Sequence, residues 1–329
     1  MATSVRPFNH AWNPAPMELR QLRYFVAIVD HGSLSRAALV LHIAQPALTQ
    51  QIRQLEEELT VQLLHRSAQG VIATDAGNTF YEHAQAILKQ VADAKSAVAQ
   101  SNDKPSGTVA LGIPQSVSGA LALPLLTAIR ATYPDITLLL TEELTGNLIV
   151  QLRSGRINLA VLFDDNQLSA FATTPMVEEQ MMYITRADSQ YGAGRGKSVS
   201  LTCALQAPLI LPGLPHGVRP RIEDVVRARG MSLVNVIEIN SVAILKSAIL
   251  ADIGATILPV APLLSEIERG DMVAHAISGE RMSRTLALCA SKNIPLTNAA
   301  AAVSRLVLEV TDELCRSARW LHAEALARE

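Results

Sequence analysis

The fold of the N-terminal quarter is decided by residues 19–66, which read LRQLRYFVAIVDHGSLSRAALVLHIAQPALTQQIRQLEEELTVQLLHR. Apolar residues recur near its start at spacings of three and four, which marks one face of a helix. These residues are Leu22, Phe25, Val26 and Val29. Gly32 is expected to end this helix, and Ser33 is a good N-cap for a second helix that runs to about residue 41.

A third helix is predicted to begin at Gln45-Pro46, because proline is favoured in the first turn of a helix. Its apolar residues step by four, three and four and give it one buried face. They are Leu48, Ile52, Leu55 and Leu59. Two short helices joined across residues 42–44 form a helix-turn-helix, at about residues 34–53. The β-prone pieces 61–66 and 71–74 then predict a small hairpin, or wing.

A helix-turn-helix binds DNA by laying its second helix in the major groove. Thr49, Gln50 and Arg53 would point away from the buried face, and Gln and Arg can make bidentate contacts to adenine and guanine. The alternative is a plain three-helix bundle with a polar surface. Local charge does not favour DNA binding, because five arginines and five acidic residues balance over residues 17–74.

A long helix is predicted over residues 75–101. Its apolar residues step by 4, 3, 4, 3 and 4, which is a heptad seam. They are Phe80, Ala84, Ile87, Val91, Ala94 and Val98. A lone helix with such a seam needs a partner, so we expect homodimerisation, with packing on its own domain as the alternative.

Beyond the polar stretch 102–107 (NDKPSG), strands and helices alternate, which predicts a parallel sheet in an α/β fold. The strands are expected at 109–113, 137–141, 159–163, 208–211, 234–239 and 255–258, and the helices at 121–132, 147–154, 220–229 and 242–251. Two similar halves, joined by hinge strands near 164–170 and 273–276, would fit this pattern.

Composition limits the protein classes that fit the sequence. The chain has 329 residues, of which 49% are hydrophobic and 18% charged, and a net charge of −2 excludes a globally basic surface. Its three cysteines are far apart and in no CxxC spacing, which fits a reducing cytosol. Residues 1–16 contain three prolines and no apolar core of a signal peptide, so we expect a disordered arm, a folded protein that begins near Met17, and a cytoplasmic location.

Residues 19–66, followed by GVIATDAG at 70–77, closely resemble the DNA-binding domain of LysR-type transcriptional regulators. The specific parts are LxYFxAIxxxGS in the first helix, the Ala37-Ala38 pair, AQPALTQQI, LExEL and TxAG. HIAQPAL and QLLHR are most similar to the nitrogen-assimilation-control branch. Later, SGTVALGI, GRINLAVL and ADIGATILP are similar in layout to the family's C-terminal domain.

The resemblance implies an α/β protein with an N-terminal, mostly α winged helix-turn-helix, a long linker helix, and a two-lobed C-terminal α/β domain like periplasmic binding proteins. The expected limits are 1–16 (arm), 17–74 (DNA-binding domain), 75–101 (linker and dimerisation helix), 107–315 (regulatory domain) and 316–329 (tail). Lobe I would comprise about 107–164 and 273–315, and lobe II about 165–272. The implied partners are double-stranded promoter DNA, further copies of the chain as a dimer or tetramer, RNA polymerase and a small effector; no cofactor, metal or membrane is expected.

Two sets of site residues follow from this reading. The DNA-binding set is Ser33, Ser35, Arg36, Gln45, Pro46, Ala47, Thr49, Gln50, Arg53, Arg66 and Gln69. In an α/β cleft, ligands bind beyond the carboxyl ends of strands, near helix N-termini. The effector-binding set at those places is Gln115, Ser116, Val117, Ser118, Thr145, Asn147, Phe163, Gly213, Leu214, Asn240 and Ser241. Such polar residues are also ordinary caps and turns, and some members of the family act without an effector.

Three positions depart from the family pattern. Thr60 stands where most members have Gly at the end of the recognition helix, and a left-handed Thr is unfavourable, so a differently shaped turn is expected. Leu64 replaces Phe behind the wing. Ala44 replaces the usual Ser before Gln-Pro and removes a hydroxyl.

The enzyme alternative lacks a motif. YGAGRGKS at 191–198 has Tyr191 where a phosphate-binding loop needs Gly, so a solvent loop is the better interpretation. The sequence contains neither HExxH nor GxSxG. An exported solute-binding protein is disfavoured by the absence of an export signal. We therefore expect a regulator and not an enzyme.

Overall fold

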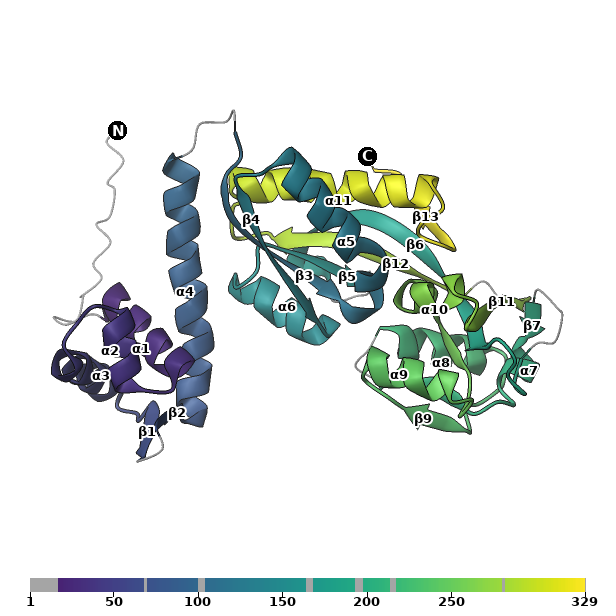
Figure 1. The fold of residues 1–329 in the computed structure, drawn as a ribbon, viewed down its shortest axis with the longest axis horizontal. Helices are drawn as coiled ribbons and strands as arrows, with labels where there is room; N and C mark the ends of the chain where they lie inside the picture. The colour runs from purple at the N-terminus through teal and green to yellow at the C-terminus, as the bar shows by residue number, and fades with distance from the viewer. Residues whose placement is uncertain are drawn as a thin grey trace, which may run out of the picture. The chain divides into compact units, whose positions relative to one another are not determined.

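The computed structural model describes residues 17–67, 70–99, 104–163, 168–192, 198–213, 217–279 and 282–328. The chain forms two compact units that divide between Ala92 and Asp93, and each is described by itself (Figure 1). The expected arm at 1–16 and the predicted site residues Gln69 and Leu214 lie outside the described residues. Within those residues, none of the helices has both the length and the apolar character needed to cross a bilayer.

The N-terminal unit is a winged helix-turn-helix. Its elements are α1 (Leu19–His31), α2 (Leu34–Val40), α3 (Gln45–Leu59), β1 (Leu64–Ser67), β2 (Gly70–Ala73) and the long α4 (Asp75–Ala99) as far as Ala92. The buried face of α3 is the predicted one, with Leu48, Ile52 and Leu55 fully buried. On α1, however, Ile28 is fully buried beside Phe25, whereas Val26 and Val29 are half-buried at the border of the apolar stripe.

The structure shows how the chain accommodates two of its three departures from the family pattern, Thr60 and Leu64. Thr60 has φ 51° and ψ 31°, so the turn keeps the left-handed shape and the expectation of a different turn was wrong. Leu64 is fully buried in the core of the unit and fills the position behind the wing. Gly77, in the TxAG motif, permits a close approach, because a Cβ there would lie 2.0 Å from the carbonyl oxygen of Leu63.

Lobe I of the C-terminal unit is a sheet with strand order β4-β3-β5-β12-β6, covered on both faces. Its elements are β3 (Gly107–Pro114), α5 (Gln115–Thr132), β4 (Ile136–Glu143), α6 (Thr145–Ser154), β5 (Leu159–Phe163), β6 (Phe171–Arg186), β12 (Ser283–Ser291), α11 (Asn298–Arg316) and β13 (Ala323–Ala325). Alternate residues of β5 face opposite sides: Val161 packs with α5 and α11, and Leu162 with α6. A strand covered on both faces reads as a continuous apolar run, as β5 does.

Lobe II continues the same sheet. The second half of β6 pairs with β10 and β11, β11 pairs with β7, and β8 and β9 form a separate parallel pair. Its elements are β7 (Ser198–Ser200), α7 (Leu201–Ala204), β8 (Leu209–Leu211), α8 (Val218–Ala228), β9 (Val236–Glu238), α9 (Val242–Leu250), β10 (Thr256–Pro259), α10 (Leu264–Glu268) and β11 (Met272–Ser278).

The two-lobed α/β fold is as expected, but three details differ. The sheet is mixed, because β12 runs antiparallel to both β5 and β6. Residues 164–167 of the first predicted hinge lie outside the described residues, and its remainder, 168–170, packs in lobe I. The second predicted hinge, 273–276, lies inside β11 of lobe II. The observed connections are β6, which leaves the lobe I core after Val177 and enters the lobe II core at Met181, and the passage from Met282 into β12. Residues expected to be a tail, 316–329, include β13, which pairs with β6, and Trp320, which is buried.

Candidate functional site

The first candidate site is the exposed face of the helix-turn-helix. Gln50 and Arg53 are exposed on the side of α3 opposite its buried face, and Thr49 is half-buried. Pro46 and Ala47 are exposed in the first turn. Sequence spacing therefore placed these side chains correctly with respect to solvent, because a helix with one continuous apolar face must present the opposite one.

One side-chain hydrogen bond connects the start of α3 to α2, and a second lies within α3. Ser35 Oγ donates to Gln45 Oε1 at 3.1 Å, and Thr49 Oγ1 donates to the carbonyl oxygen of Gln45 at 3.0 Å. Ser33 caps α2 by accepting from the backbone N–H of Arg36. Ala44, the N-cap of α3, has extended φ and ψ and no hydroxyl to cap the helix. The first N–H groups of α3 thus lack a side-chain acceptor from the N-cap, and such groups attract phosphate oxygens.

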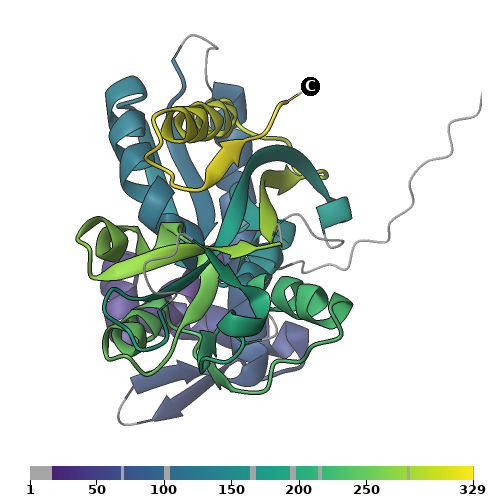
Figure 2. The same ribbon diagram turned by 90° about the vertical axis from the view of Figure 1, so that its right-hand side faces the viewer.

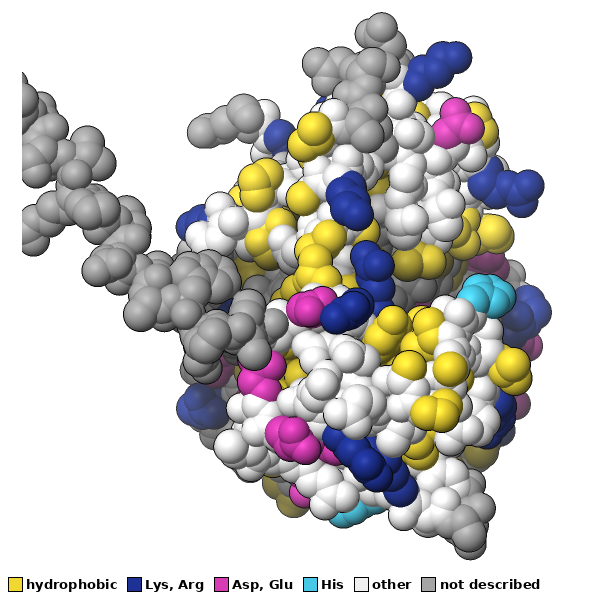
Figure 3. All heavy atoms as spheres, turned by 90° about the vertical axis from the view of Figure 1, so that its left-hand side faces the viewer, with side chains coloured by type: hydrophobic (Ala, Val, Ile, Leu, Met, Phe, Trp, Pro, Cys, Tyr) yellow, Lys and Arg dark blue, Asp and Glu magenta, His cyan; other side chains and the backbone are white. Residues whose placement is uncertain are grey.

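Arg66 lies on the wing and is held by an acidic residue of α3. Its Nη2 is 3.7 Å from Glu56 Oε2, while Glu56 Oε1 accepts from the backbone N–H groups of Leu63 at 2.9 Å and Leu64 at 3.1 Å. Glu56 therefore fixes the start of the wing and restrains Arg66. On the face drawn in Figure 3, acidic side chains lie among the basic ones.

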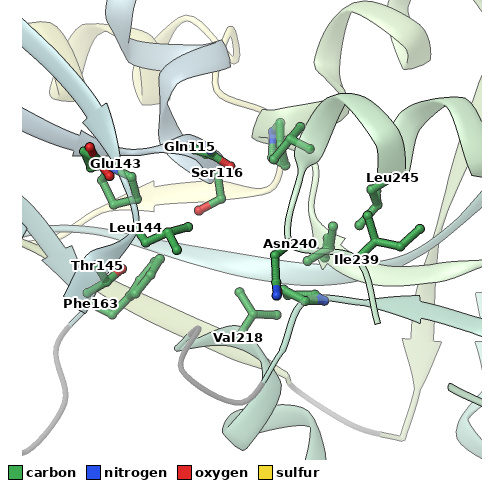
Figure 4. A pocket seen from close by; sticks show the side chains of 15 residues that line it. Gln115, Ser116, Glu143, Leu144, Thr145, Phe163, Val218, Ile239, Asn240 and Leu245 are labelled. Carbon is green, nitrogen blue, oxygen red and sulfur yellow. The ribbon is translucent and has the colours of Figure 1, made fainter. Parts of the chain in front are cut away.

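The second candidate site is a cleft between lobes I and II, with about 520 Å³ of space including solvent at its mouth. From lobe I come the end of β3, the first residues of α5 and α6, and the end of β5; from lobe II come residues around β8, β9 and α9. Figure 4 shows Ser116, Leu144 and Phe163 facing Val218 and Asn240 across this space. The lining residues are Pro114, Gln115, Ser116, Glu143, Leu144, Thr145, Phe163, Pro212, Val218, Ile239, Asn240, Val242, Leu245, Leu258 and Pro262.

Five of the predicted effector-binding residues line this cleft: Gln115, Ser116, Thr145, Phe163 and Asn240. The others that the structure describes have structural roles. Val117 is buried in the lobe I core, Ser118 Oγ donates to the carbonyl oxygen of Gln115, Asn147 Nδ2 donates to Glu143 Oε2, the N–H of Gly213 donates to Asn240 Oδ1, and Ser241 caps α9.

Sequence reasoning missed the apolar lining. Ile239 and Leu245 lie in a predicted strand and a predicted helix, and Val218 and Leu258 resemble core residues, so their sequence context carried no sign of a cleft. The available signal was position: Leu144 lies in the segment expected to follow the second strand, and Ile239 immediately precedes Asn240, which was selected as a residue beyond a strand end. The cleft is consequently more apolar than expected, with hydroxyls and amides at a few points.

A buried cation lies behind the cleft wall. The guanidinium of Arg284 is 4.4 Å from the centre of the Phe163 ring, and its Nη1 donates to Ser116 Oγ at 3.1 Å. Burial lowers the pKa of Arg284 from its usual value, and the carboxylate of Glu179 opposes this shift. Since Glu179 neutralises the charge, the cleft does not have the unbalanced cationic wall that would suit a multiply charged anion. Among the described residues, no group of His, Cys, Asp and Glu could hold a metal ion.

Comparison with known proteins gives matches along nearly the whole chain. Residues 19–78 match the family model of bacterial regulatory helix-turn-helix proteins of the lysR family, and residues 102–312 match the LysR substrate binding domain. The chain is 36% identical over 295 residues to the nitrogen assimilation regulatory protein nac of Klebsiella aerogenes, which covers 89% of this chain and 95% of that protein.

Two solved structures have the same fold. A full-length OxyR variant from Pseudomonas aeruginosa gives a TM-score of 0.67 at 20% identity, and the alignment covers 96% of this chain and 99% of that one. Full-length CbnR in complex with its target DNA also gives 0.67, at 22% identity, with 89% and 100% covered.

Proposed function

The chain belongs to the LysR family of bacterial transcriptional regulators, and on that premise we propose that α3 reads the operator while the interlobe cleft takes a small effector. As a member of the family it is a DNA-binding regulator that acts as an oligomer and carries an effector-binding domain; it is not an enzyme. The similarity to the nac protein agrees with the branch that the sequence motifs indicate.

Gln50 and Arg53 are the proposed base-reading residues. The observation that carries this assignment is their exposure on α3 directly opposite the fully buried Leu48, Ile52 and Leu55. Gln50 lies in the N-terminal half of the recognition helix, the part whose residues contact base edges in helix-turn-helix proteins. A bidentate contact from either side chain discriminates against a wrong base by about 1–3 kcal/mol.

Phosphate contacts are assigned to the residues around these two. Arg36 and Arg66 supply charge, and Ser33, Ser35 and the uncapped start of α3 supply neutral donors. Gln45, Pro46, Ala47 and Thr49 form the surface that approaches the groove, and Gln69 remains a proposal from sequence alone. Because Arg66 is paired with Glu56, it must leave that partner or share it when it meets a phosphate.

The two roles are separated by titrating Gln50→Ala and Arg66→Ala on operator and random DNA across a salt series. The operator is found by footprinting the DNA upstream of the protein's own gene. Gln50→Ala should reduce the difference in affinity between operator and random DNA. Arg66→Ala should instead weaken binding to both DNAs alike and reduce the slope of log affinity against log salt concentration by about one. If Gln50→Ala weakened binding to both DNAs equally, Gln50 would contact the DNA backbone and its base-reading role would be refuted.

A homodimer through α4, its doubling to a tetramer, and contact with RNA polymerase complete the proposal. For the effector, the apolar lining with a few hydroxyls and amides and the carboxylate of Glu143 favours a small, largely apolar molecule with one or two polar groups. Footprinting repeated with candidate metabolites tests this part: a change in the protected region that Leu144→Trp abolishes supports the cleft as the effector site. Leu123→Trp, on an exposed position of α5, is the matched control.

A further inference from the structure

A buried ion pair joins the two strands that connect the lobes. Arg284 on β12 lies opposite Glu179 on β6 in the strand register, with Nε 2.7 Å and Nη2 2.6 Å from Glu179 Oε2. Only 4% of the Arg284 side chain and 2% of the Glu179 side chain are exposed. A buried charge without its partner is costly. Because separating Arg284 from Glu179 would leave both charges uncompensated, we expect the two side chains to move together.

The pair lies at the hinge. Glu179 immediately precedes the point at which β6 passes from lobe I into lobe II, and Arg284 follows the return passage from Met282. Both connections between the lobes are therefore fixed to each other by one charged contact in a region shielded from water.

On one side, Arg284 reaches the cleft. Its Nη1 donates to Ser116 Oγ at 3.1 Å, and its guanidinium lies against the Phe163 ring. Both of these residues line the cleft, and Figure 4 shows the Ser116 side chain among the lining residues. A group that binds at the Ser116 hydroxyl competes with, or realigns, the hydrogen bond from Arg284.

On the other side, Glu179 holds the C-terminal segment, residues 317–328. Trp320 Nε1 donates to Glu179 Oε1 at 2.8 Å, and β13 pairs with β6 beside it (Figure 2). The segment touches both lobes: Trp320 packs in the lobe I core and Leu321 against the lobe II core. It thus crosses the hinge on the strand that connects the lobes.

We propose that Arg284 is a positioning residue that couples the cleft to this C-terminal segment, through the chain Ser116–Arg284–Glu179–Trp320. Each oxygen of Glu179 is engaged, one by Arg284 and one by Trp320. Movement of Trp320 frees one oxygen, and rotation of the carboxylate then displaces Arg284 from Ser116. The coupling acts in both directions, and it does not depend on DNA binding or on the identity of an effector.

The test is a double-mutant cycle on the full chain, with Ser116→Ala and Trp320→Phe and urea unfolding at fixed protein concentration. Both changes leave the ion pair in place. Ser116→Ala removes only a hydroxyl, whereas Trp320→Phe also leaves a cavity, and the cycle subtracts this separate cost. If the relay exists, the unfolding equilibrium constant of the double variant departs from the product of the single effects by at least about twofold. Ser118→Ala is the control, because its hydroxyl donates to Gln115 and not to Arg284. In the control cycle, Ser118→Ala and Trp320→Phe should have additive effects on the free energy of unfolding. If the effects of Ser116→Ala and Trp320→Phe are equally additive, the proposal is overturned.

A spectroscopic readout separates coupling from general loss of stability. The sequence has two tryptophans, Trp12 and Trp320, so Trp12→Phe leaves Trp320 as the single emitter. In that background Ser116→Ala should shift the Trp320 emission maximum of the native protein, whereas Ser118→Ala should not. An unchanged emission spectrum in Ser116→Ala counts against the relay as directly as an additive cycle does.

Discussion

The ring of Phe80 on α4 meets the ring of Phe25 on α1 edge to face, with centroids 5.1 Å apart and planes at 75°. Edge-to-face pairs of this kind add to the stability that burial of the rings provides. Ala84, one turn later, is also fully buried. The first part of the predicted heptad seam therefore packs on its own domain, and dimerisation through the later part of the helix stays a prediction.

Oligomer formation should depend on the later part of the seam, where Ile87 is 39% and Val98 is 89% exposed. Ile87→Asp places a charge in the proposed interface and should give a smaller species by analytical ultracentrifugation, with weaker operator binding. A cooperative melting transition of the monomeric variant should show that the DNA-binding unit is still folded. Ala92→Asp, at an exposed position of the same helix outside the seam, is the matched control. An unchanged sedimentation coefficient for Ile87→Asp would contradict dimerisation through α4.

Thr60 is predicted to be a site of stored backbone strain. The left-handed conformation costs an L-residue about 1–2 kcal/mol, a cost that glycine does not have, and a β-branched side chain fits this conformation poorly. Thr60→Gly should therefore raise the free energy of unfolding by about 1 kcal/mol, even though it loses the hydrogen bond from Oγ1 to the carbonyl oxygen of Leu59. Urea denaturation measures the change. Thr60→Ala retains a Cβ and should gain less; an equal gain would mean that the side-chain branching, and not the left-handed backbone, is unfavourable.

The sequence was most informative where structure is local. Helix faces, the Gly32 stop, the Ser33 cap and the wing follow from residues a few positions apart, so α1–α4 lie close to their predicted ranges. In the C-terminal unit β3, β4 and β5 were also found from their apolar runs. The strands β6 and β12 were missed because their pairing joins residues more than a hundred positions apart, and local patterns do not reveal such pairing.

The cleft illustrates the same limit. The expectation that ligands bind beyond strand ends found Phe163 and four of the polar lining residues, because it uses position in a fold; it missed Glu143 and the other apolar residues, which resemble any core. The sequence around Arg284 did not indicate a role for this residue, since nothing near it shows that Glu179, Ser116 and Phe163 surround it. Those contacts exist only once the two connections between the lobes lie side by side.

Gly217 marks a close approach of lobe II to the cleft wall of lobe I. Its φ is −57°, so alanine is allowed by the backbone, but a Cβ would lie 2.7 Å from Phe163 Cδ2. Gly217→Ala should lower the free energy of unfolding by about 1–3 kcal/mol through overpacking. Phe163→Leu should restore part of this loss, which makes the two changes non-additive.

The control for that experiment is Gly146→Ala in α6, where the added Cβ meets no atom within 4 Å. Alanine in place of a glycine in the middle of a helix stabilises a protein by about 0.5–1 kcal/mol. Gly146 lies in the first turn of α6, so we expect a stabilisation at or below the lower end of this range. Opposite signs for the two glycines, measured by urea denaturation, are the expected result. If Gly217→Ala were neutral, the contact with Phe163 would have to be loose enough to relax without cost.

Acid should weaken lobe II through Glu266 on α10. Lys246 on α9 lies 3.0 Å from Glu266 Oε2, and Arg269 lies 3.4 Å from Oε1. Burial alone would raise the pKa of Glu266, but the hydrogen bond and charge of Lys246, with further hydrogen bonds, lower it below 4.5. A carboxylate whose pKa is lower in the folded state contributes stability that is present above its unfolded pKa and is lost as the pH falls through its folded pKa.

Replacing the Glu266 carboxylate should therefore have an effect that depends on pH. Glu266→Gln should cost about 1.5–3 kcal/mol near pH 7, the value of a hydrogen bond to a charged group, and progressively less below pH 4.5. Glu268→Gln, exposed on the same helix, is the control and should change little at any pH. Urea unfolding of the three proteins from about pH 7 down to about pH 3, the range over which a carboxylate of this kind titrates, measures the effect. A Glu266→Gln difference that stays constant over this range would show that packing, and not charge, explains the loss.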